Sequence, residues 1–360
     1  MGLLAGWQHY IDLTVPAAKV TDDLAHFPVC IQIRDGAGIN SADLTPIFDE
    51  VGANYKKIAV TAEDGVTQLY CEVVSWSSGD EYAELWVSKS GWTLNGGVEN
   101  KVRIYFDNDH ADNDSYVGLT GSTPAENVWD SNFKLVCHME DNPDTGHVMD
   151  STSNDNDGTK KAANEPIEAT GKIGKGQNCD GVDDYIALSP TFLDGLASVT
   201  FSCWIKPSTY LSGIWGSWAI RAKSAADLNI AEVCVRQDDD VSVSVSAGTD
   251  HNKAATWAGW TEDTDSHITG VYDGSHISLF LNGEYKTQTA CTGNILTPNS
   301  LTIGGYNIAQ FFYHGIIDEL HFSNVARSVA WVGASYETQR DQFYNCGGFV
   351  TLNPIALFCA

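Results

Sequence analysis

A strand with one buried face is predicted at Val199-Thr-Phe-Ser-Cys-Trp-Ile-Lys-Pro207. Val, Phe, Cys and Ile alternate with Thr, Ser and Trp along it, which gives the period of two that a strand with one core face requires. Similar short runs, bounded by Gly, Asp and Asn, recur on both sides of it. We therefore expect an all-β protein, in which only 328–340 has the three-to-four spacing of a helix.

The dipeptide Asn282-Gly283 is the clearest local signal of strand pairing. It separates the strand-like runs 278–281 and 284–286. A two-residue type I′ turn needs positive φ at both of its positions, and Asn followed by Gly is the pair that adopts it most readily. A β-hairpin is predicted here.

A polar, turn-rich stretch at 107–127 divides the strand runs into two sets. The chain of 360 residues is long enough for two cores. We expect a small N-terminal β-sandwich domain at 1–127 and a larger domain at 128–345. The apolar tail at 346–360 is either a final strand or a segment that inserts into a partner.

The chain is strongly acidic, with 47 Asp and Glu residues against 20 Lys and Arg and a formal net charge of −27. A field of this sign repels phosphate backbones and argues against nucleic acid as a partner. It suits divalent cations, neutral glycans or solubility alone. No apolar run reaches the length of a membrane span, and the opening Met-Gly-Leu-Leu-Ala-Gly lacks the basic segment of a signal peptide.

The nine cysteines include no Cys-x-x-Cys pair, which gives no support to a zinc ribbon or a thioredoxin-type motif. Several lie inside apolar runs, where a free thiol behaves as a small buried hydrophobe. The odd count and irregular spacing argue against an extracellular disulfide framework. These features fit a virion protein made in the cytoplasm, and removal of a signal peptide is the alternative.

Five motifs follow one another in the second part of the chain: Asp150-Ser-Thr-Ser-Asn154 with Asp157-Gly158-Thr159, Gly176–Ile186, Val199–Pro207, His267–Gly283, and Gly315–Phe322 with Asn324–Ser328. In this order they resemble the laminin-G-like, concanavalin A-type jelly rolls of bacterial, archaeal and phage surface proteins. Cys179 stands where that family usually has Phe. The resemblance implies two β-sandwich domains, the second a concanavalin A-like jelly roll, with one short C-terminal helix.

The first part of the chain resembles an uncharacterised family of β domains that often precedes such jelly rolls. Runs at 7–14, 24–29, 72–76 and 104–106 carry this resemblance. Since that family has no established function, it implies an architecture only.

The resemblance also implies a structural calcium ion, where the loop that enters the jelly roll meets its closing strand. The expected ligands are Asp150, Asn156, Asp180 and Asp318, which offer the carboxylate and amide oxygens that Ca²⁺ prefers. The alternative is that these residues form Asx-turns.

Tryptophans in loop-like stretches are the candidate ligand-binding residues, because an indole face stacks on sugar rings and also anchors protein interfaces. They are Trp215, Trp218, Trp257 and Trp260. Trp204 lies within the alternating strand, and we expect it to be packed against the sheet.

Catalysis is not expected. A retaining glycosidase needs two carboxyl groups about 5–5.5 Å apart. Neighbours such as Asp318 and Glu319, or Asp183 and Asp184, would point to opposite faces of a regular strand. The sequence contains neither a Gly-x-Ser-x-Gly elbow nor a His-Glu-x-x-His motif. His138 and His267 are expected to be ordinary sheet residues, packed or hydrogen-bonded in place.

The sequence thus favours a non-enzymatic recognition or decoration protein, on a virion surface or outside the cell. Its expected partners are a glycan, a surface protein, other virion proteins or further copies of itself. Two alternatives remain open, a secreted carbohydrate-active enzyme or its accessory module, and a cell-surface structural or adhesion protein.

Overall fold

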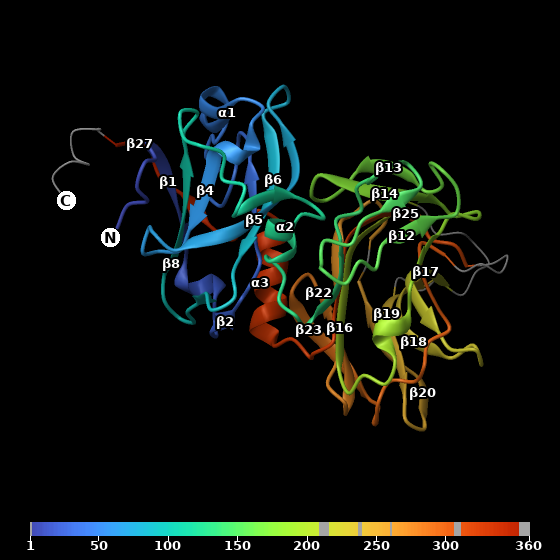
Figure 1. Ribbon diagram of the computed structural model, residues 1–360. Helices are drawn as coiled ribbons and strands as arrows, with labels where there is room; N and C mark the ends of the chain where they lie inside the picture. Colours follow the sequence, from blue (N-terminus) through green and yellow to red (C-terminus); the bar gives the residue numbers. More distant parts are fainter. Residues whose placement is uncertain (1, 209–215, 237–239, 260, 306–310, 353–360) are drawn as a thin grey trace. The chain divides into compact units, whose positions relative to one another are not determined.

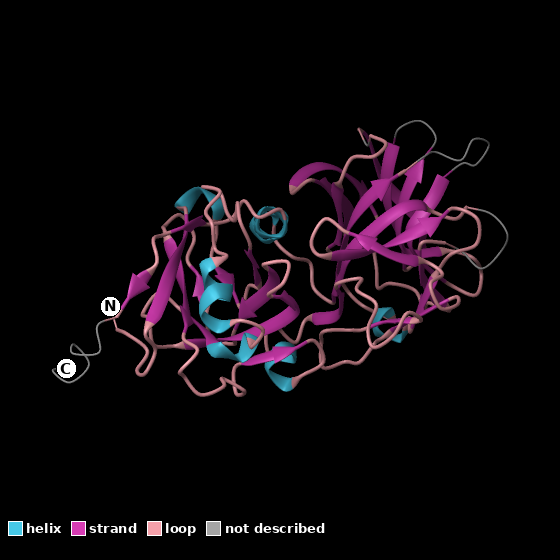
Figure 2. Cartoon of the chain, turned by 90° about the horizontal axis from the view of Figure 1, so that it is seen from above, coloured by secondary structure: helices cyan, strands magenta, loops and turns pink. Residues whose placement is uncertain are grey.

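The structure is a computed structural model that describes residues 2–208, 216–236, 240–259, 261–305 and 311–352 (Figures 1 and 2). The chain forms two compact units, residues 1–130 with 333–360 and residues 131–332. Strands dominate, as predicted. The described helical segments are α1 (Pro46–Val51), α2 (Thr123–Glu126), α3 (Val329–Gln339) and the 3₁₀ turns η1 (Ala17–Lys19), η2 (Tyr55–Lys57) and η3 (Thr191–Leu193). None of the described helices is long and apolar enough to cross a membrane.

The first unit is built on a nine-stranded sheet with the order β26-β1-β8-β4-β5-β6-β3, to which β27 and β9 add at β1 and β5, and β2 pairs separately with β7. The long strand β5 joins two halves, since its first two residues pair with β4 and the rest with β6. The strands are β1 (His9–Val15), β2 (Leu24–Ala25), β3 (Val29–Ile33), β4 (Ile58–Thr61), β5 (Gln68–Ser77), β6 (Tyr82–Ser88), β7 (Thr93–Leu94), β8 (Asn100–Phe106), β9 (Val117–Leu119), β26 (Asn345–Cys346) and β27 (Val350–Thr351).

The C-terminal segment differs from the predicted ranges 128–345 and 346–360. The division between the units falls within α3, and 333–345 belong to the first unit. β26 and β27 both pair with β1, so part of the predicted tail forms final strands. The Thr338 hydroxyl accepts a hydrogen bond from Cys30 N at 2.9 Å and holds the end of α3 on the same unit. Local sequence patterns do not predict that the end of the chain pairs with its first strand.

The second unit is a sandwich of two eight-stranded sheets. Sheet I has the order β13-β14-β25-β16-β21-β22-β23, with β10 added at β25, and sheet II has the order β11-β12-β15-β24-β17-β18-β19-β20. The strands are β10 (Phe133–Cys137), β11 (His147–Val148), β12 (Gly158–Lys160), β13 (Ile167–Thr170), β14 (Lys175–Asp180), β15 (Ile186–Leu188), β16 (Val199–Pro207), β17 (Gly216–Lys223), β18 (Asn229–Arg236), β19 (Asp240–Ala247), β20 (Asp250–Ala258), β21 (Ser266–Tyr272), β22 (His276–Leu281), β23 (Glu284–Ala290), β24 (Ser300–Ile303) and β25 (His314–Ser323).

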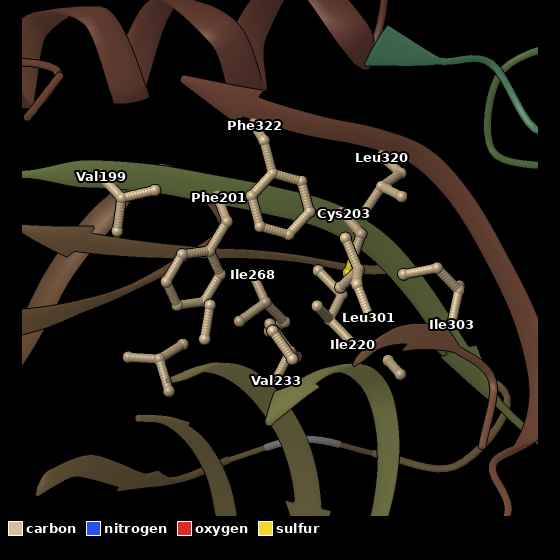
Figure 3. Close-up of a cluster of buried hydrophobic side chains, with 14 of the residues drawn as sticks. Val199, Phe201, Cys203, Ile220, Val233, Ile268, Leu301, Ile303, Leu320 and Phe322 are labelled. Atoms are coloured by element: carbon tan, nitrogen blue, oxygen red, sulfur yellow. The ribbon is translucent and has the colours of Figure 1, made fainter. Parts of the chain in front are cut away.

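The core of this unit fills the space between the two sheets (Figure 3). β16 has the predicted alternation, and Phe201 and Cys203 point from sheet I into the same cluster as Ile220 and Val233 of sheet II. Each sheet therefore keeps an outer face that the sandwich core does not use. Those two outer faces carry the polar residues described below.

One hairpin turn and one β-bulge test the local predictions. Asn282 and Gly283 have φ of 53° and 77° and connect β22 to β23, so the predicted hairpin is confirmed. The prediction that Asp318 and Glu319 point to opposite faces is wrong. β25 contains a β-bulge, and Glu319 has a φ of 49°. Asp318 pairs with Trp204, and Glu319 contacts His321, which lies on the same outer face of sheet I.

Candidate functional site

The outer face of sheet II carries a row of polar side chains across four neighbouring strands. Thr302 of β24 pairs with Arg221 of β17, Arg221 pairs with Glu232 of β18, and Glu232 pairs with Ser244 of β19. Residues opposite each other in antiparallel strands point to the same face. All four side chains are largely buried, although they lie on the side away from the core.

A second row runs beside the first, from Trp218 of β17 through Cys234 of β18 to Ser242 of β19. We call the two rows together the β17–β19 polar face; its members are Trp218, Arg221, Glu232, Cys234, Ser242, Ser244 and Thr302.

Trp218 brings aromatic character to this face. Its ring meets Phe311 edge to face at 4.8 Å, and the Arg221 guanidinium stacks on it at 3.9 Å. Arg221 also lies 3.7 Å from Asp227, whose carboxylate forms a 2.6 Å ion pair with Lys223. An aromatic ring, a cation and a carboxylate therefore meet within one patch.

Glu232 is a buried acidic residue of this face whose pKa is raised. Burial raises its pKa to about 6, and the nearby Arg221 cation offsets only part of that cost. The side chains of Trp218 and Ser244 lie close enough to Glu232 to lower its pKa by hydrogen bonding. Burial also lowers the pKa of Arg221. Titratable groups with shifted pKa values are enriched at functional sites.

Three polar atoms of this face lack hydrogen bonds. Within the described part of the chain, Trp218 Nε1, Glu232 Oε2 and Ser244 Oγ are buried and have no partner of normal geometry. Leaving a buried donor or acceptor unpaired costs about 1–3 kcal/mol. Because Trp218 and Ser244 lie beside Glu232 and lower its pKa, the three atoms are neighbours whose hydrogen bonds to one another are poorly aligned.

The predicted tryptophans separate into different environments. Trp218 belongs to the polar face. Trp257, on the edge strand β20, pairs with the core-facing Val241 and is 43% exposed, so it lies on the opposite side of sheet II. Trp204 is buried on the outer face of sheet I, against the imidazole of His267. Trp215 and Trp260 lie outside the described residues.

The predicted calcium ligands mostly hold the backbone. Asp150 accepts hydrogen bonds from Val136 N, Thr152 N and Asn156 N, each at 3.0 Å, and burial raises its pKa to about 6. The Asn156 side chain donates to a backbone carbonyl of β10. Asp318 accepts from the backbone N–H of Ile173 and Glu319.

Asp180 accepts hydrogen bonds from two backbone N–H groups in its own turn. Its carboxylate also lies with those of Asp183 and Asp184, all within 4.8 Å of one another. The prediction that Asp183 and Asp184 point apart on a strand is therefore wrong, because this segment is a turn. The four predicted ligands do not gather at one point in the described chain, and calcium remains a prediction.

A further titratable group lies on the outer face of sheet I. Glu319 Oε1 lies 2.8 Å from His138 Nδ1, and Glu319 Oε2 lies 2.9 Å from His321 Nε2. Burial alone would raise the pKa of Glu319, but the two imidazoles hold it below the usual range. His138 is packed and hydrogen-bonded in place, as expected, and its partner is a buried carboxylate. The bulge at Glu319 creates this cluster, and the local sequence carried no signal of it.

Comparison with known proteins identifies the class of the second unit. Residues 180–333 match the laminin-G-like family model described as the concanavalin A-like lectin/glucanases superfamily. With its two facing sheets, the second unit is a concanavalin A-like jelly roll. A search of the curated proteins gives no match.

Solved structures with a similar fold include the binding domain of botulinum neurotoxin serotype G, at 12% identity and a TM-score of 0.47. The match covers 58% of this chain and 51% of that domain, so this chain spans about half of the length of the neurotoxin domain. The serotype D ligand-binding domain, in complex with N-acetylneuraminic acid, has the same identity, TM-score and coverage. Domain 4 of AbnA, an extracellular arabinanase from Geobacillus stearothermophilus in complex with arabinotriose, is 20% identical with a TM-score of 0.43, over 56% of this chain and 97% of that domain.

Proposed function

We propose that the protein is a non-enzymatic recognition protein whose jelly roll binds a glycan at the β17–β19 polar face. The observation that carries the proposal is the set of three buried polar atoms without a hydrogen bond of normal geometry, on the neighbouring side chains Trp218, Glu232 and Ser244. Sugars present many hydroxyl groups, which donate and accept hydrogen bonds in the same way as a bound water. One sugar hydroxyl can accept from the indole N–H and donate to the carboxylate.

The composition of this face supports a neutral or weakly charged sugar. Arg221 and Glu232 lie opposite each other and offset each other's charge, while Ser242 and Ser244 add hydroxyl groups. Sites that bind small molecules combine aromatic side chains with a few placed polar groups in this way. A strongly anionic ligand is disfavoured by the net charge of −27.

The test is a glycan array followed by titration calorimetry on the best ligand. Trp218→Ala is expected to weaken binding at least about tenfold, through loss of the aromatic surface and the indole N–H. Trp257→Ala is the matched control, because Trp257 is an exposed tryptophan on the other side of the same sheet. Equal losses in the two variants, or no glycan bound by the wild type, would contradict the proposal.

We further propose that the protein is displayed on a virus or phage particle, as a decoration or tail-associated component. Support comes from the eight described cysteines, which are all free and buried. This state suits synthesis in a reducing compartment. Mass spectrometry of purified particles tests the idea, and particles that lack the chain contradict it.

A second candidate function, glycoside hydrolysis, has one observation in its favour. A carboxyl group with a pKa of about 6, as in Glu232, suits a general acid. The nearby carboxylate of Asp227 is paired with Lys223 and is largely exposed, which suits a nucleophile poorly. Release of reducing sugar from a polysaccharide panel, abolished by Glu232→Gln, would favour this second function.

A further inference from the structure

The outer face of sheet I brings two imidazoles and one carboxylate to a single point. Glu319 and His321 lie two residues apart on β25, and the bulge at Glu319 turns its carboxylate to the same side as His321. His138 follows β10, whose Cys137 pairs with Leu320 of β25. The three side chains therefore meet where the end of β10 lies beside β25.

The geometry of this group fits one metal ion. Zn²⁺ bonds to imidazole nitrogen and carboxylate oxygen are about 2.1 Å long, so ligand atoms that share an ion lie within about 4.2 Å of one another. The contacts of His138 and His321 with Glu319 measure 2.8 and 2.9 Å, and all three ligand atoms lie within 4.8 Å of one another. A small closing movement would complete the arrangement.

The surroundings also suit a bound cation. Glu319 is fully buried, and His138 and His321 are only 5% and 7% exposed. Among the described residues, the side chains paired with Glu319 are these two imidazoles. A buried carboxylate is costly unless it is paired or coordinates a metal. A divalent cation held by all three side chains would place a positive charge directly beside this buried carboxylate.

We propose that His138, Glu319 and His321 form a binding site for a divalent transition-metal ion of the zinc type. Two imidazole nitrogens and one carboxylate oxygen are the protein ligand set of many four-coordinate zinc sites. Imidazole suits zinc and its neighbours, whereas calcium takes oxygen ligands. This site is therefore separate from the predicted calcium site, and it lies on the opposite side of the sandwich from the β17–β19 polar face.

The test uses the full chain, stripped of metal with a chelator and titrated with Zn²⁺ in the presence of excess Mg²⁺. Magnesium occupies oxygen-only sites on the acidic surface, so the remaining binding reports nitrogen-containing sites. The wild type is expected to bind one equivalent. His321→Gln and Glu319→Gln are expected to bind at least about tenfold more weakly, because each removes a ligand. His251→Gln, at an exposed histidine of the same unit, is the matched control and should bind as the wild type does.

Replacement of zinc by Co²⁺ gives a second measurement that needs no variant. Cobalt bound to the wild type by two imidazoles should show the intense visible bands of a four-coordinate site. Absence of stoichiometric Zn²⁺ binding, or a wild-type cobalt spectrum of an octahedral aqueous ion, would overturn the proposal. Binding that is lost in the His251 variant and retained in the other two would also overturn it.

Discussion

Glu232→Gln should make the protein more stable at neutral pH. Glu232 is 5% exposed, and burial raises its pKa from 4.5 to about 6. The native state therefore binds the proton more tightly than the unfolded state does, and the ionised form destabilises the fold. A shift of this size corresponds to about 2 kcal/mol at pH values above both pKa values. Glutamine has nearly the same shape and is never ionised, so the variant avoids this cost.

The sign of the pH dependence is fixed by the same shift. Because the folded pKa is the higher one, the wild type loses stability as the pH rises from 4.5 to about 6. The advantage of the Gln variant should grow through that interval and level off above it. Urea unfolding of both proteins at a series of pH values measures the difference directly, since all other titrating groups cancel in it.

Glu284→Gln provides the matched control. Glu284 is exposed and, among the residues that the structure describes, forms its ion pair with Lys286 at the surface. Its loss should therefore change the free energy of unfolding by less than about 0.5 kcal/mol. A Glu232→Gln variant that is less stable than the wild type at pH 7 would refute the reasoning. So would a stability difference that does not change between about pH 4 and 8.

Other expectations concern packing, calcium and the thiols. Gly270→Ala should destabilise the jelly roll by about 1–3 kcal/mol in urea unfolding, since a Cβ there would lie 2.5 Å from the Phe201 ring; Gly79→Ala, with open space around it, should be nearly neutral, and equal effects would contradict this. Calcium at a hundred times its Kd should stabilise chelator-treated protein by about 2.7 kcal/mol, and an unchanged thermal midpoint would count against a calcium site. The described thiols should react slowly with iodoacetamide in the native state, because they are buried and burial raises the pKa of thiols such as Cys71; rapid labelling without urea would show the packing to be wrong.

Much of the jelly roll could be predicted because its determinants are local. The alternation in β16 follows from one core face, and the turn at Asn282 and Gly283 follows from the φ values that a tight hairpin needs. The helix expected at 328–340 is observed at Val329–Gln339. β26 and β27 pair with β1, which lies more than 300 residues earlier in the chain. The periodicity of a sequence does not indicate which distant strands pair.

The residues of the two proposed sites were harder to predict, because each depends on a departure from regular geometry or on a cross-strand neighbour. The rule that neighbouring strand residues point to opposite faces excluded a joint role for Asp318 and Glu319. The rule does not hold here, because Glu319 has a positive φ within a β-bulge. Arg221 and Glu232 are separated by a turn and become neighbours only through the pairing of β17 and β18. Trp218 was predicted as a ligand-binding residue from its aromatic ring alone. Its neighbours on the β17–β19 polar face are defined by the register in which β17 pairs with β18.

The glycan and metal proposals can fail independently, because they use opposite outer faces of one sandwich. Changes at Trp218 or Glu232 act on the outer face of sheet II, and changes at His321 act on that of sheet I. The apolar core lies between them, and its side chains pack from both sheets. Substitutions with no shared partners usually have additive effects on stability. A glycan-binding defect in the His321 variant would therefore mean that the two faces are coupled through the core, or that the site for the sugar lies on sheet I.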